Sequence, residues 1–110
     1  MLKIKPNQQF ITLTGSATDF ASLARAIKKS RAGNVKEFEV QDGLIKLICN
    51  NNSTEVNYSD GVMLLVYSES TKNRLHSLIS MPADTPCGSA FTISFENQAN
   101  IFMTLELIVE

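Results

Sequence analysis

The fold is decided in residues 9–33, which read QFITLTGSATDFASLARAIKKSRAG. Apolar and β-branched side chains alternate with a period of two up to Thr14, and this alternation predicts a strand. Gly15 interrupts the pattern, and Ser16 with Asp19 has the spacing of a helix N-cap followed by an acid in the first turn. An apolar stripe with the helical period comes next, formed by Phe20, Leu23, Ala24 and Ile27. We therefore predict a strand that leads through one glycine into an amphipathic helix.

Two Asp-Gly pairs predict hairpins after this helix. Asp42-Gly43 lies between two apolar runs, and Asp60-Gly61 leads into the run Val62–Tyr67. Asp-Gly is favoured in two-residue hairpin turns because both turn residues take positive φ there. The run 62–67 is apolar throughout, so we expect its strand to be central in the sheet or buried on both faces.

The order of predicted elements occurs twice in the chain. Residues 9–49 and 62–109 each read as strand, helix, strand, strand, with Leu23 and Leu78 in equivalent places and a strand at 54–58 between them. We predict one α+β domain over residues 1–110, a mostly antiparallel sheet with two helices on one face, built from pseudo-duplicated β-α-β-β units.

The sheet face opposite the helices is the first candidate for a binding surface. We expect it to be polar apart from four large apolar residues, namely Leu44, Ile48, Phe102 and Ile108. Such residues are candidates for docking a partner. Scattered surface hydrophobes without a function are the alternative.

Composition limits the classes of partner. Of 110 residues, 44% are hydrophobic and 19% are charged, and ten Lys and Arg against eleven Asp and Glu give a formal charge of -1. Nucleic-acid and membrane-surface binding depend on concentrated positive charge, so we expect neither partner. No apolar run approaches the ~20 residues that cross a bilayer, and the N-terminus lacks the apolar core of a secretory signal. We expect a cytoplasmic protein.

The residues that could carry chemistry are few. Cys49 and Cys87 are expected to be free thiols, and Cys87 with His76 and Asp84 is the one thiol triad that can be assembled. His76 lies on the polar side of its helix, which favours an ordinary surface histidine. We expect no catalytic residue, no metal and no cofactor, and an enzyme that uses Cys87 is the third hypothesis.

Three segments carry a resemblance to a known family. Residues 1–6, the strand and glycine at 11–16, and the helix at 20–27 with its Leu23-Ala24 pair resemble small bacterial immunity proteins of polymorphic toxin systems. The resemblance implies a cytoplasmic protein that binds a toxin domain and protects the producing cell. The order of elements also resembles one domain of a DNA sliding clamp.

The leading hypothesis is a non-enzymatic protein-binding module of the immunity type. Its candidate contacts are Asp42, Asp60 and Glu69 for a basic toxin domain, or the four apolar residues of the outer sheet face. A homo-oligomeric structural subunit, such as a homodimer, is the alternative. A sliding-clamp-like, DNA-associated domain ranks below both.

Overall fold

The computed structural model describes residues 1–7, 10–50, 54–96 and 102–110, without the side chains of residues 95, 96, 102 and 103. Two helices and eight strands occupy these ranges, so the α+β prediction is confirmed. The elements in chain order are β1 (Lys3–Pro6), β2 (Phe10–Gly15), α1 (Ala17–Lys29), β3 (Val35–Val40), β4 (Gly43–Asn50), β5 (Glu55–Ser59), β6 (Val62–Ser68), α2 (Glu69–Ile79), β7 (Ala90–Glu96) and β8 (Phe102–Val109).

The strands form two sheets where the sequence predicted one. Sheet A has the order β1-β2-β8-β7 and sheet B the order β3-β4-β6-β5. The four hairpin pairs are antiparallel, and the two with Asp-Gly turns were predicted, whereas β2 pairs with β8 and β4 with β6 in parallel. The expectation of a single sheet was wrong, because alternation shows only which side chains point inward. One sheet and two sheets facing a common core have the same alternation.

Each sheet combines hairpins from both halves of the chain. The order strand, strand, helix, strand, strand occurs twice, and the first hairpin of each half joins the last hairpin of the other half. Each half therefore has one more strand than the predicted β-α-β-β unit, and β1 corresponds to β5.

Both helices begin with a capping box. The Ser16 side chain accepts a hydrogen bond from the Asp19 backbone amide, and the Asp19 carboxylate accepts one from the Ser16 amide. Ser68 and Thr71 form the same arrangement at the start of α2. These bonds satisfy amide groups that the first turn of a helix leaves free.

The caps also fix which helical residues correspond. Counted from its N-cap, Leu23 of α1 matches Leu75 of α2, and both are buried. The predicted equivalence of Leu23 and Leu78 was wrong, since the Leu78 side chain is 42% exposed. Leu78 is adjacent to the inward-facing Ile79, and one helical step turns its side chain away from the core.

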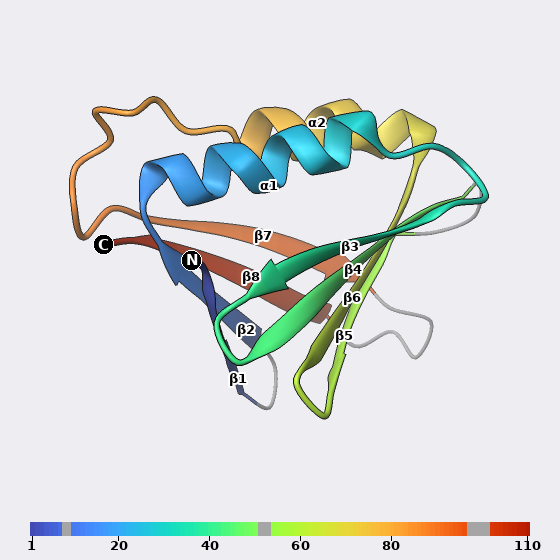
Figure 1. Cartoon of the computed structure of the whole chain (residues 1–110), viewed down its shortest axis with the longest axis horizontal. Coiled ribbons are helices and arrows are strands. Elements are labelled where there is room, and N and C mark those ends of the chain that lie inside the picture. Colours follow the sequence, from blue (N-terminus) through green and yellow to red (C-terminus); the bar gives the residue numbers. More distant parts are fainter. Residues whose placement is uncertain (8–9, 51–53, 97–101) are drawn as a thin grey trace.

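The two helices lie side by side, and the strands of both sheets lie below them (Figure 1). One core cluster fills the space between these layers, with inward residues from both sheets and from both helices. The largest fully buried side chains include Tyr67 and Phe20. Within the described ranges, neither helix has the length and apolarity needed to cross a membrane.

Candidate protein-binding surface

The two Asp-Gly turns lie next to each other at one end of sheet B. Asp60 and Gly61 both have positive φ, as predicted for a two-residue hairpin turn. In the first hairpin Asp42 has positive φ, whereas Gly43 already belongs to β4. A Cβ atom on Gly43 would lie 2.4 Å from the Gly61 carbonyl oxygen, and this oxygen accepts a hydrogen bond from the Leu44 amide. Gly43 thus permits the contact that holds the two turns together.

The outer face of sheet B is aliphatic along its two central strands. Leu44 and Ile48 of β4 point away from the core and are half-buried, as expected. The paired residues of β6 lie beside them on the same face, since Leu44 pairs with Val62 and Ile48 with Val66. This aliphatic face, as we call it, consists of Val35, Leu44, Ile48, Val62, Leu64 and Val66, and Lys46 lies among them. Val66 is only 5% exposed, so the accessible apolar surface comes from the other five aliphatic residues.

Sequence reasoning missed the contribution of β6 to this face. The run Val62–Tyr67 was expected to be buried on both faces or central, and β6 is central in sheet B. Met63, Leu65 and Tyr67 are fully buried, but Val62 and Leu64 remain partly accessible. The helix that follows Ser68 could have indicated this contribution, because two helices on the same side of the strands leave the opposite face of β6 uncovered.

Carboxylates surround the aliphatic face. Glu37 and Glu39 lie on the outer side of β3, and Glu55 lies on the outer side of β5. Asp42 and Asp60 add two exposed carboxylates at the turns. None of these five residues, the acidic rim, belongs to an ion pair in the described part of the chain. Lys46, opposite Glu37, is the one cation within the described part of the aliphatic face, so the face combines apolar surface with a net negative charge.

The four apolar candidates do not share one surface. Leu44 and Ile48 lie on sheet B, whereas β8 with Phe102 and Ile108 belongs to sheet A. Ile108 is flanked by Thr14 and Ala90, on a face whose other described side chains are mostly Thr, Ser, Glu and Lys. The Phe102 side chain lies outside the described residues. The expected common face was wrong because it assumed a single sheet.

Glu69 lies apart from the other two acidic candidates, at the opposite end of β6. Its carboxylate lies 3.0 Å from the Lys72 ammonium group and accepts a hydrogen bond from the Cys49 thiol at 3.6 Å. The Lys72 hydrogen bond holds the pKa of Glu69 below its usual value, against a smaller opposing effect of burial. Lys72 also donates to the Ser30 carbonyl, so this group connects the end of α1 to the start of α2.

The two cysteines are free thiols in different surroundings. Cys49 is fully buried, and burial together with the Glu69 carboxylate raises the pKa of its thiol. Cys87 is exposed in the loop before β7. Among the described residues, no hydrogen bond connects Cys87 with His76 or Asp84, and no group of His, Cys, Asp and Glu has a metal-binding arrangement.

Comparisons with known proteins give one structural similarity. No family model matches the sequence. No curated protein matches it either. The crystal structure of Drosophila Suppressor of Fused is similar to 98% of this chain, with a TM-score of 0.49 and 18% sequence identity. The chain spans 26% of that protein's length.

Proposed function

We propose that this chain is a non-enzymatic protein-binding module of the immunity type, which neutralises a toxin domain by binding it on the aliphatic face. The observation that carries the proposal is the acidic rim around an accessible apolar centre. Apolar residues at the centre of a protein interface supply most of the affinity, and charges at its margin select the partner and accelerate association. The partner is therefore a domain with a basic surface and an apolar anchor.

The size of the surface suits such a partner. Four strands about 4.8 Å apart, with three outward residues along each, cover roughly 20 Å by 20 Å. This area already includes Glu37, Glu39 and Glu55. A stable interface takes about 800 Å² from each partner, so the partner must also contact the Asp42 and Asp60 turns and the strand edges around the face. Two copies of this chain docked face to face would place rim carboxylates near each other. This repulsion favours a basic partner over a homodimer on this face.

The test uses a defined toxin candidate, the C-terminal domain encoded by the reading frame beside this one. Co-expression should protect cells from that domain, and the purified pair should form a one-to-one complex in titration calorimetry. Ile48→Ser should weaken binding by about tenfold, the effect of losing one well-packed apolar contact.

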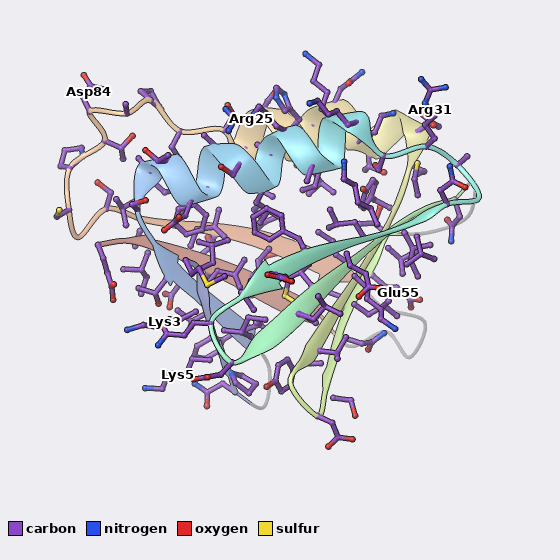
Figure 2. The ribbon with its side chains drawn as sticks, viewed as in Figure 1. Lys3, Lys5, Arg25, Arg31, Glu55 and Asp84 are labelled. Carbon is purple, nitrogen blue, oxygen red and sulfur yellow. The ribbon has the colours of Figure 1, made fainter. Side chains whose placement is uncertain are left out.

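Two matched controls separate this surface from the rest of the molecule. Ile108→Ser makes the same change at the corresponding outward position of β8 and should leave the affinity unchanged. Glu55→Lys should slow association and reduce its dependence on salt, whereas Asp84→Lys makes an equal charge change in a distant loop and should have little effect. Figure 2 shows Glu55 beside the strands of sheet B and Asp84 at the opposite end of the molecule.

Three outcomes contradict the proposal. The first is an absence of binding and of protection by the unmodified chain. The second is equal loss of affinity for Ile48→Ser and Ile108→Ser. The third is a dimer in sedimentation velocity that Ile48→Ser dissociates, which would assign the aliphatic face to a second copy.

A further inference from the structure

A cleft of about 540 Å³ lies between α2, the start of β5 and the edge strand β7. From α2 it is lined by Thr71, Arg74, Leu75 and Leu78. The buried Ile93 lies on the β7 side, and Leu78 is 42% exposed. The cleft thus combines three apolar residues with one cationic side chain and four residues that carry hydroxyl groups, namely Thr54, Thr71, Thr92 and Ser94, and it does not include the aliphatic face.

The corresponding place in the other half of the chain is filled. Leu2 occupies the position in its hairpin that Thr54 occupies in the second hairpin, as the pairings of Ile4 with Leu13 and Val56 with Leu65 establish. The Leu2 side chain is 1% exposed, and the Leu2 carbonyl accepts a hydrogen bond from the Gln41 amide. This contact draws β1 towards the end of β3 and closes the first half.

Among the described residues the second half has no hydrogen bond equivalent to that between Gln41 and Leu2, although β5 and β7 approach each other. Thr54 has a short polar side chain, and its hydroxyl lies 3.2 Å from that of Thr71 at the wall of the cleft. A leucine in the first half therefore corresponds to a threonine in the second, and an open cleft remains beside that threonine. A leucine-sized side chain supplied by a ligand would complete the packing that Leu2 provides in the first half.

The free edge of β7 follows the same cleft. β7 pairs only with β8 among the described residues, and the Ser89 carbonyl accepts a hydrogen bond from the Val109 amide. In an antiparallel pair, every second residue directs its backbone amide and carbonyl groups toward the partner strand, so those of Phe91 and Ile93 also point toward β8. The amide and carbonyl groups of Thr92 and Ser94 then point away from β8, and both residues line the cleft. An edge strand with such groups can pair with an added strand.

We propose that this cleft binds an extended peptide segment of a partner protein, which pairs with the free edge of β7. An aliphatic side chain of the peptide packs on Leu75, Leu78 and Ile93 in the place that Leu2 occupies in the other half. A neighbouring carboxylate of the peptide pairs with the Arg74 guanidinium, which belongs to no ion pair in the described part of the chain. The β7 backbone provides affinity, and the leucine-sized space and Arg74 provide selectivity.

The test uses a defined probe, the peptide acetyl-Thr-Leu-Thr-Asp-Thr-amide, and the same peptide with Lys in place of Asp. Amide shifts of the isotope-labelled full chain are followed by NMR during titration. The Asp peptide should shift the amides of Thr92 and Ser94 and those of α2 around Arg74. The Lys peptide and the Arg74→Ala variant should each bind about 3- to 10-fold more weakly, the range for losing one charge-assisted hydrogen bond.

Two pairs of variants test the backbone and the cavity separately. Thr92→Pro removes an outward amide without removing a β7–β8 hydrogen bond and should abolish the shifts, whereas Thr92→Ala should retain them. Thr54→Leu places the residue type of Leu2 in the second half and should block the peptide, whereas Thr54→Ser should not. The unfolding transition of each variant shows whether it remains folded, and Thr54→Leu is expected to be at least as stable as the unmodified chain.

Three outcomes would overturn the proposal. Full binding to Thr54→Leu would mean that the peptide lies elsewhere, and equal affinity for the Asp and Lys peptides would remove Arg74 from the site. Shifts at Thr92 and Ser94 that depend on protein concentration would assign the edge to a second copy. Binding by the Ile48→Ser variant should be unchanged, so a failure of this cleft is distinct from a failure of the aliphatic face.

Discussion

The buried pair Ser30 and Tyr67 makes a sharp prediction about stability. The Tyr67 side chain is 0% exposed, and its hydroxyl lies 2.5 Å from the Ser30 hydroxyl. The Ser30 hydroxyl in turn lies 2.6 Å from the Ile27 carbonyl oxygen. A serine hydroxyl has one hydrogen and a carbonyl can only accept, so Ser30 donates to Ile27 and Tyr67 donates to Ser30.

This direction makes the two single substitutions unequal. Tyr67→Phe removes one neutral hydrogen bond and retains the one from Ser30 to Ile27, so we expect a loss of about 1 kcal/mol in the free energy of unfolding. Ser30→Ala removes both bonds and leaves the buried Tyr67 hydroxyl without an acceptor, which should cost about 2–3 kcal/mol. The Ile27 carbonyl still accepts from the Ser30 backbone amide in that variant.

The double variant provides the decisive comparison. With Ser30→Ala already present, Tyr67→Phe removes an unsatisfied hydroxyl, so it should restore about 1 kcal/mol rather than cost more. Urea unfolding followed by circular dichroism measures all four proteins, with equal m-values as the check on two-state behaviour. The reasoning is refuted if Tyr67→Phe costs as much as Ser30→Ala, or if the double variant is less stable than Ser30→Ala.

Three further predictions follow from single positions. Gly43→Ala should lower the unfolding free energy by more than about 2 kcal/mol because its Cβ atom would meet a carbonyl oxygen at 2.4 Å, whereas Gly33→Ala, with positive φ but open space, should cost about 1 kcal/mol. Burial raises the pKa of Asp19, but hydrogen bonds from the Ser16 cap and the N-terminal ammonium group lower it by more, so this pKa lies below its usual value. The stability that Asp19 adds should therefore be present above its unfolded pKa of about 3.9 and be lost as pH falls through the lower folded pKa. The free energy of unfolding measured from pH 5 to 3 tests this, and that of the Asp19→Asn variant should depend less on pH. Iodoacetamide should modify Cys87 quickly and Cys49 only upon unfolding, as mass spectrometry of the folded protein would show; rapid modification of both would contradict the burial of Cys49.

The local elements were predictable because their signals lie within a few residues. The Ser16 and Asp19 capping box and the Asp60-Gly61 turn depend on neighbours in sequence, and both occur as expected. Strand β1 escaped prediction because it is a short edge strand with two lysines and a proline in Lys3–Pro6. Leu2 and Ile4 do alternate with Lys3 and Lys5, but the run is too short and too close to the proline to be distinguished from a loop.

The division into two sheets was beyond the reach of local patterns. It depends on the parallel pairing of β2 with β8 and of β4 with β6, which joins segments far apart in the chain. Alternation is the same in both arrangements, and only the partner of each strand differs. The candidate surface inherited this error, since Ile48 and Ile108 were placed together and lie on different sheets.

The two halves share a framework and differ where a partner could bind. Ile48 and Ile108 occupy corresponding outward positions, yet Ile48 has Val35 and Val66 beside it and Ile108 has Thr14 and Ala90. A fold needs inward residues only, so nothing in the core explains an aliphatic outer face on one sheet and a polar one on the other. The same reasoning applies to Leu2 and Thr54, where one half is closed and the other is open. Differences between equivalent positions of a repeated framework therefore indicate function better than apolar character alone, and they favour the aliphatic face and the β7 cleft over the polar face of sheet A.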